Sequence, residues 1–139
     1  ERKTGFLVLC KMENKSAAAV REGFERQFKK IDSFLRLSMT YERGSEMAEH
    51  PLMSKHLKMA IYFTDPHAPW QRGSNENING LLRQYFPKGG DLSGVSQVRL
   101  NDVAWLLNTR PRKRFYFQTP QELFDQATAD YLNHFALDS

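Results

Sequence analysis

The sequence predicts an α/β fold, because segments with the period of a strand alternate along the chain with segments that have the period of a helix. Residues 35–42 alternate apolar with polar side chains, as a half-buried strand does. Residues 17–30 instead carry apolar side chains at steps of three and four, which predicts one buried helix face. Residues 60–63 form a short apolar run that leads through a loop rich in Pro and Gly into a helix over residues 74–86.

Three further elements are expected around this framework. Residues 5–12 are an apolar run rich in strand formers and bounded by turn signals, which predicts another strand. Residues 46–58 read as a helix interrupted or restarted at Pro51, because proline removes a backbone donor. The spacing of apolar side chains predicts a helix over residues 97–108.

The C-terminal part begins with a helix-start signal. Thr119 can cap a helix whose first position is Pro120, and Glu122 completes a capping box. The last residues are amphipathic at best, so a loosely held tail is expected over residues 126–139.

Composition limits the classes of protein that the chain can represent. The 139 residues suffice for one domain or part of one, and the first residue, Glu1, suggests that the chain continues a longer protein upstream. A net charge of +4 permits a polyanionic partner without requiring one. Cys10 is the one cysteine, which excludes a disulfide framework and a Cys-rich zinc site and favours a reducing cytoplasm. No apolar segment is long enough for a membrane span, so a membrane partner is not expected.

Two acidic residues stand where ligand sites of α/β folds form. Glu42 ends a predicted strand, and Glu76 opens the helix that follows the next predicted strand. Two carboxylates placed in this way could share a divalent metal ion. Either could instead be an ordinary acid, since a carboxylate at a helix N-terminus complements the helix dipole and sixteen acids make many pairs.

Longer strings narrow the choice. The run TDPHAPWQRGSNENINGLLRQYFPKG, with YERGSEMAEH before it and LNTRPRKRFYFQTPQELF after it, resembles bacterial transposases of the insertion-sequence-30 type. These transposases have a catalytic core like that of retroviral integrases. The resemblance covers nearly the whole chain, as far as about Phe124, and is most specific over residues 65–89.

The resemblance implies a ribonuclease H-like fold, in which helices flank a mixed five-stranded sheet. It implies an active site of two aspartates and a glutamate that bind two magnesium ions, with manganese as the alternative ion. The family glutamate falls on Glu76 and the second aspartate on Glu42, while the first aspartate would precede the chain. Residues 1–125 would then be a partial integrase-like core that lacks the first strand and most of the second, and residues 126–139 a C-terminal tail.

The chain departs from the family pattern at the metal-binding acids of the active site. Glu42 replaces an aspartate, and its extra methylene moves the carboxylate of a site that tolerates little displacement. The first acid is missing as well. Phe115 and Tyr116 stand where the family tends to have leucine and glycine, so an altered turn is expected.

The resulting expectation is a fragment of a DNA transposase that acts in DNA integration by metal-dependent phosphodiester cleavage and strand transfer, impaired in this chain. One alternative is an inactive remnant that binds DNA or pairs with an intact transposase. Another is a product with no stable fold. Whether the chain is itself an enzyme therefore stays open.

The implied partners are DNA, both transposon ends and target, and further copies of the transposase, in a bacterial cytoplasm. A group of residues on and around the Glu76 helix and in a basic run is expected to contact phosphates, with a solvated surface as the alternative for each. The group comprises Arg72, Asn79, Arg83, Lys88, Arg110, Arg112 and Lys113.

Overall fold

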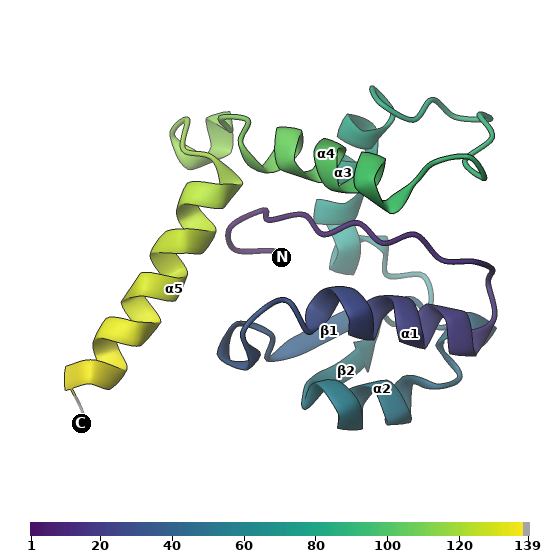
Figure 1. Cartoon of the computed structure of the whole chain (residues 1–139), viewed down its shortest axis with the longest axis horizontal. Coiled ribbons are helices and arrows are strands. Elements are labelled where there is room, and N and C mark those ends of the chain that lie inside the picture. Colours follow the sequence, from purple (N-terminus) through teal and green to yellow (C-terminus); the bar gives the residue numbers. More distant parts are fainter. Residues whose placement is uncertain (138–139) are drawn as a thin grey trace. The chain divides into compact units, whose positions relative to one another are not determined.

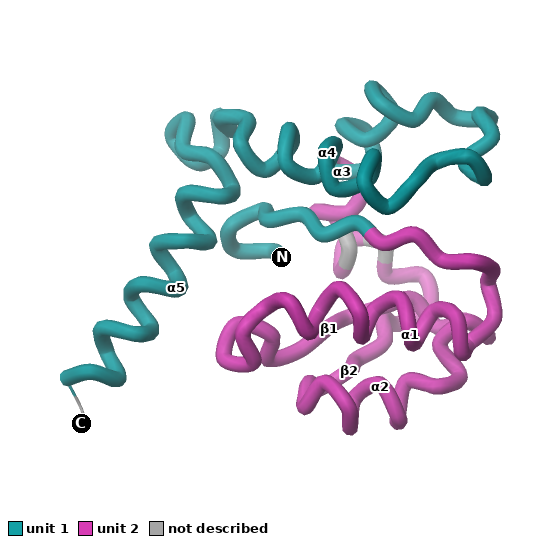
Figure 2. The backbone as a smooth tube through the Cα atoms, in the orientation of Figure 1, with its two compact units in different colours: residues 1–9, 78–139 teal, residues 10–77 magenta. Residues whose placement is uncertain are grey.

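The computed structural model describes residues 1–137 and confirms the α/β class, with helices and a two-stranded parallel sheet joined by loops and short 3₁₀ turns (Figure 1). The side chains of Pro69 and Arg72 lie outside the described part. The chain divides into two compact units (Figure 2). Unit 1 comprises Glu1–Leu9 and Ile78–Ser139, and unit 2 comprises Cys10–Asn77. No helix in residues 1–137 is long and apolar enough to cross a membrane.

Unit 2 is built on the sheet. Strand β1 (Ser38–Tyr41) runs parallel to β2 (Ala60–Phe63), and Tyr41 pairs with Phe63 at the end of the ladder. The connection between the strands carries α2 (His50–Leu57). Parallel strands need a crossover of this kind, because a tight hairpin can join only antiparallel ones.

The core of unit 2 lies on one face of this sheet, between the strands and the two helices α1 (Ala17–Phe28) and α2. Alternate strand residues point toward the helices, while Ser38, Thr40 and Tyr62 on the other face are exposed. Parallel sheets are usually covered on both faces. Because one face of this sheet is exposed within unit 2, the core of the unit lies entirely between the sheet and this single helical layer. Its buried members are Val20, Met47, Met53, Leu57 and Met59.

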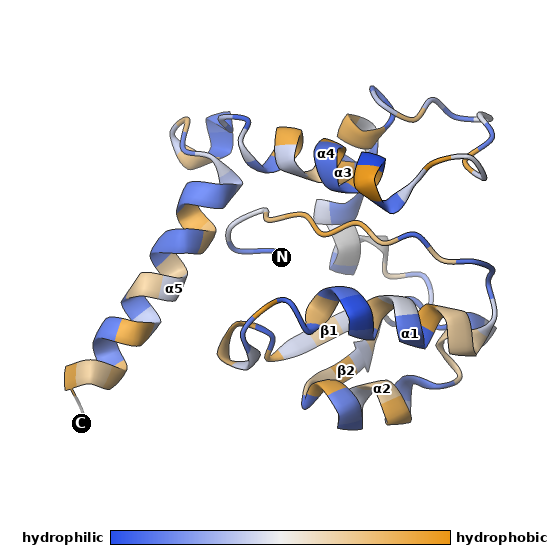
Figure 3. Cartoon of the chain, in the orientation of Figure 1, coloured by the Kyte–Doolittle hydropathy of each residue, from blue (hydrophilic) through white to orange (hydrophobic). Residues whose placement is uncertain are grey.

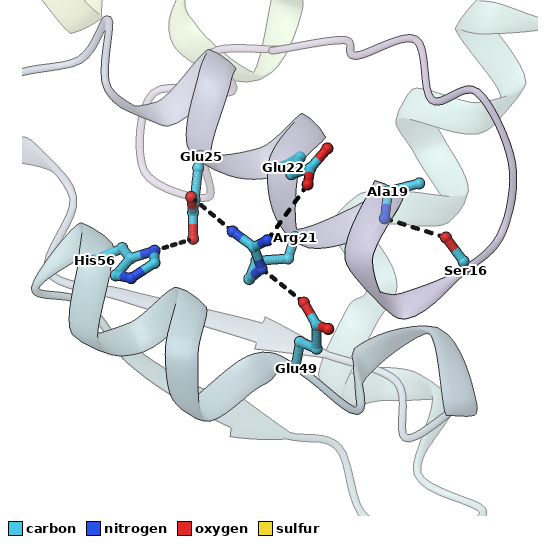
Figure 4. A network of polar contacts seen from close by, with 7 residues as sticks. All are labelled: Ser16, Ala19, Arg21, Glu22, Glu25, Glu49 and His56. Carbon is cyan, nitrogen blue, oxygen red and sulfur yellow. Dashed lines mark hydrogen bonds and ion pairs between the residues drawn. The ribbon is translucent and has the colours of Figure 1, made fainter.

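A partly buried polar network ties α1 to the segment that contains α2 (Figure 4). The Arg21 guanidinium donates to Glu49 at 2.6 Å and to Glu25 at 3.2 Å. The hydrogen bond to Glu49 is the main cause of a raised pKa for Arg21. Glu25 is buried and its second oxygen lies 2.8 Å from His56 Nδ1, so both of its oxygens are satisfied. The network fixes how α1 and α2 lie against each other beside the apolar core.

Unit 1 contains α4 (Gln97–Asn108) and α5 (Pro120–Leu137), and α3 (Gly73–Leu82) runs from unit 2 into it. The predicted helix over residues 97–108 is thereby confirmed. Val103 and Leu107 are fully buried on α4. The rings of Phe6 and Phe124 stack with their centroids 4.2 Å apart, which holds the N-terminal segment against α5.

The strand predicted over residues 5–12 is wrong. The segment is extended and apolar, as Figure 3 shows for residues 6–9, but it belongs to no sheet. Its backbone bonds to side chains instead. The Asn108 amide accepts from Leu7 N–H at 2.8 Å and donates to Leu7 C=O at 2.9 Å, so one side chain takes the place of a neighbouring strand. In the other unit, Arg26 donates to Lys11 C=O at 2.9 Å.

Three smaller differences concern element ends. The predicted helix over residues 46–58 is a 3₁₀ turn (Ser45–Met47) followed by α2, with Pro51 in the first turn of α2, where its missing N–H costs nothing. Helix α3 ends at Leu82 rather than near residue 86. The expected loose tail is largely helical, because α5 continues to Leu137.

The capping box predicted at the start of α5 is confirmed. Thr119 N–H donates to the Glu122 carboxylate at 2.7 Å, and Glu122 N–H donates to Thr119 Oγ1 at 3.1 Å. The expected division between a core over residues 1–125 and a tail over residues 126–139 stays a prediction.

Replacing Asn108 by aspartate should destabilise unit 1 selectively. The substitution keeps an acceptor for Leu7 N–H but sets a carboxylate against Leu7 C=O in a buried place, which should cost about 1–3 kcal/mol. Amide hydrogen exchange of residues 5–9 and denaturant unfolding measure the loss. Asn101→Asp is the matched control, because exposed Asn101 only accepts through Oδ1 from Gln97, and aspartate can do the same. Equal unfolding free energies for the two variants would contradict the role given to Asn108.

Candidate metal site and nucleic-acid interface

Glu42 lies directly after β1, at the edge where both parallel strands have their carboxyl ends. The ladder continues one step past the strands, since Thr64 N–H donates to Tyr41 C=O at 2.9 Å. Glu42 is exposed. Its position directly after a strand agrees with the sequence pattern, while its role as a metal ligand stays a prediction.

Glu76 lies in the first turn of α3, beyond the loop that leaves the same edge of the sheet. A reciprocal pair closes this loop: Asp65 N–H donates to Gln71 Oε1 at 2.9 Å, and Gln71 Nε2 donates to Asp65 Oδ2 at 3.1 Å. These two hydrogen bonds hold the two ends of the loop between β2 and α3 close together. Glu76 is exposed near the positive end of the α3 dipole, where acidic residues are common.

These two carboxylates match the oxygen ligands that magnesium prefers. They are fewer than the implied triad, and within residues 1–137 no three His, Cys, Asp or Glu side chains gather to hold a metal ion. The structure therefore does not itself show a metal site, and the assignment of Glu42 and Glu76 as metal ligands stays a prediction.

The predicted phosphate-contacting residues around α3 are distributed along its second half and beyond. Asn79 is exposed on α3, and Lys88 is exposed in the loop that follows. Arg83 directly follows the last residue of α3 and is also exposed, and its N–H donates to Asn79 C=O at 3.1 Å. The side chain of Arg72 lies outside the described residues. All three described side chains are open to solvent, as phosphate contacts require.

The basic run forms a compact loop, which we call the basic turn (residues 110–118). Two backbone hydrogen bonds of Arg112 close the loop. Arg112 N–H donates to Gln118 C=O at 3.0 Å, and Phe117 N–H donates to Arg112 C=O at 2.9 Å. A short 3₁₀ helix (Lys113–Phe115) lies inside it. The cations of the basic turn are thus presented on a fixed backbone.

The positive charge of the basic turn is not neutralised locally. Among the described residues, none of its four cations forms an ion pair with a carboxylate. Arg112 Nε is buried without a hydrogen-bond partner, and burial together with the charges of Arg110 and Arg114 lowers the pKa of Arg112. Arg110 bonds only a neutral partner, Gln84 Oε1, at 3.1 Å. Such a turn attracts polyanions.

Two aromatic residues of the basic turn were not anticipated as functional. Tyr116 is 92% exposed and Phe117 68% exposed, and both adopt left-handed backbone with φ of 53° and 68°. Tyr116 therefore keeps, at a cost, a conformation that glycine adopts freely. The sequence signal was present, since three aromatic residues (115–117) directly follow three cations (112–114), but neither exposure nor φ can be read from it.

Comparison with known proteins supports the resemblance. The chain is 44% identical over 130 residues to the transposase for insertion sequence element IS1086 of Cupriavidus metallidurans, covering 94% of this chain and 38% of that protein. It is 40% identical over 129 residues to transposase InsI for IS30A of Escherichia coli, covering 93% and 34%. It is 36% identical over 126 residues to the transposase for IS4351 of Bacteroides fragilis, covering 91% and 38%.

The predicted resemblance to transposases of the insertion-sequence-30 type is thereby confirmed. The chain spans little more than a third of the length of these relatives. No family model matches the chain, and no solved structure matches it.

Replacing Tyr116 by glycine should stabilise the chain. Removing the strain of the left-handed backbone should raise the free energy of unfolding by about 1–2 kcal/mol. The greater conformational freedom of glycine in the unfolded chain should lower it by about 0.5–1 kcal/mol, so the net effect is stabilising. Thermal and denaturant unfolding measure it. Tyr131→Gly is the matched control, because the same substitution inside α5 should destabilise. A loss of stability in the Tyr116 variant would show that its ring contributes packing.

Proposed function

We propose that this chain, a homologue of IS30-type transposases over nearly its whole length, is the segment of a DNA transposase that carries the final active-site acid and the adjoining DNA contacts. The observation that carries the proposal is Glu76, flanked by Asn75 and Asn77 in the first turn of α3, in a chain 44% identical to one such transposase. The parent reaction is phosphodiester cleavage followed by strand transfer.

The proposed fold of the whole catalytic core is ribonuclease H-like. Two observations support it: β1 and β2 are parallel, and a helical crossover joins them. In that fold the two strands would belong to a larger mixed sheet. Its remaining strands would extend an edge of the ladder, where backbone N–H and C=O groups need partners.

The proposed metal ligands are Glu76 and Glu42, with magnesium as the ion. When bound, magnesium would activate the attacking oxygen and stabilise the leaving oxygen at the phosphorus. The chain's own contribution is to hold the two carboxylates at the carboxyl ends of the parallel strands and at the N-terminus of α3. Glu42 is proposed to weaken the site, because glutamate displaces the carboxylate by one methylene from the position of an aspartate.

The proposed DNA contacts are the exposed side chains Asn79, Arg83 and Lys88 and the cations of the basic turn. Their support is accessibility and uncompensated charge. Contacts of this kind neutralise phosphates and release counterions, so they act without reading the sequence of the DNA.

Binding of the 139-residue chain to duplex DNA should weaken steeply with salt, and Lys113→Ala should make the dependence shallower. Loss of one phosphate contact should lower the slope of log affinity against log salt by about one. Fluorescence anisotropy across a salt series measures the slope. Lys55→Ala is the matched control, an exposed lysine on α2 outside the basic turn. Equal slopes for the two variants would show that Lys113 does not contact a phosphate.

A chimaera tests the catalytic part of the proposal. The 129 aligned residues of this chain replace the matching segment of transposase InsI for IS30A, and transposition is measured with Glu42 unchanged and with Glu42→Asp. The Asp form should be roughly 100-fold more active, since misplacement of a ligand by about 1 Å has an effect of that order. Glu76→Gln should abolish activity in both forms.

Equal activity of the Glu42 and Asp forms would show that this glutamate serves as a metal ligand without loss. Activity that survives Glu76→Gln would overturn the assignment of Glu76. If no form transposes while the chain still binds DNA in a salt-sensitive way, the chain is a DNA-binding remnant.

A further inference from the structure

The exposed aromatic pair of the basic turn has no place in the function proposed so far. Neither the Tyr116 nor the Phe117 ring contacts another ring among the described residues, although their neighbour Phe115 lies under the Arg114 guanidinium at 4.3 Å. Two adjacent large rings exposed to water form an apolar surface that is a candidate binding site.

The backbone holds these two rings in place. Phe117 N–H bonds to Arg112 C=O at 2.9 Å, and Tyr116 N–H bonds to Lys113 C=O at 3.1 Å. These bonds maintain left-handed backbone at two consecutive bulky residues, where such strain is uncommon and is concentrated at functional sites. A partner would therefore meet rings on a fixed loop, which reduces the ordering cost of binding.

The surroundings of the rings define the chemistry of that partner. Arg110, Lys113 and Arg114 are exposed on the same turn and, within residues 1–137, none of them pairs with an acid. The partner must supply negative charge at close intervals together with flat apolar faces. Single-stranded nucleic acid has both, and cationic grooves with aromatic side chains are how proteins bind it.

We propose that Tyr116 and Phe117 form a stacking platform for unpaired DNA bases, with the cations of the basic turn holding the flanking phosphates. The proposal deepens the DNA-binding part of the proposed function and rests on it. It assigns base contact to two residues, one of which replaces the glycine that the family tends to have. Every base offers a π face, so the platform is expected to tolerate different sequences.

The test compares three oligonucleotides of equal length: a single strand, the same strand with abasic sites in place of its bases, and the duplex. Binding of the 139-residue chain to each is measured by fluorescence anisotropy at constant salt. The unmodified chain should bind the base-bearing strand about fivefold or more tighter than the abasic strand, a lower bound for stacking of one base. Equal affinity for these two strands would overturn the proposal.

Tyr116→Gly separates stacking from folding, because it removes the ring while relieving the backbone. It should abolish the preference for the base-bearing strand and leave affinity for the abasic strand unchanged. A preference that survives both Tyr116→Gly and Phe117→Ser would overturn the platform. Tyr131→Ala, on α5 outside the basic turn, is the control and should preserve the preference.

Tyr116→Trp provides a direct readout of contact. The indole should retain the preference, and the emission it adds to that of the two native tryptophans should be quenched by the base-bearing strand more than by the abasic one. Absence of added quenching would overturn stacking at this position. Failure of the proposed function has a different result, because duplex binding in the salt series used for Lys113→Ala would then show no salt dependence.

Discussion

Unit 2 depends on a parallel ladder of only four residue pairs, from Ser38 opposite Ala60 to Tyr41 opposite Phe63. Two strands of this length are not stable in water unless something packs on them. The helices α1 and α2 supply that layer on one face, and the Arg21–Glu25–His56 network keeps the two helices together. Because Glu42 and the loop to Glu76 both leave the carboxyl edge of the ladder, the position of each acid follows from the same packing.

The sequence was most informative where local pattern alone determines structure. The stripe along α1 and the capping box of Thr119 and Glu122 need no distant partner, and both are present. The segment 5–12 shows the limit of such reasoning. Its composition favours extended backbone and the backbone is extended, but a strand also needs a neighbour, and periodicity does not reveal that its partners are the side chains of Asn108 and Arg26.

The same distinction applies to the candidate site. Placement of Glu42 after a strand and of Glu76 at a helix start could be predicted, because strand and helix boundaries have local signals. The role suggested for Tyr116 could not be predicted, since it depends on a left-handed φ and on exposure, which the backbone bonds of the basic turn determine. A glycine-to-tyrosine difference suggested an altered turn, whereas the structure has Tyr116 in the left-handed conformation itself.

The two kinds of chemistry proposed for this chain differ in how much displacement they tolerate. Magnesium needs its oxygen ligands near 2.0–2.1 Å in near-octahedral order, so the proposed metal site would be sensitive to one added methylene at Glu42. Phosphate attraction decays over a Debye length of about 8 Å at physiological salt, so the cations of the basic turn act from many positions. If the proposed function holds, a substitution in the metal site should therefore weaken cleavage more than a single substitution in the basic turn weakens DNA binding.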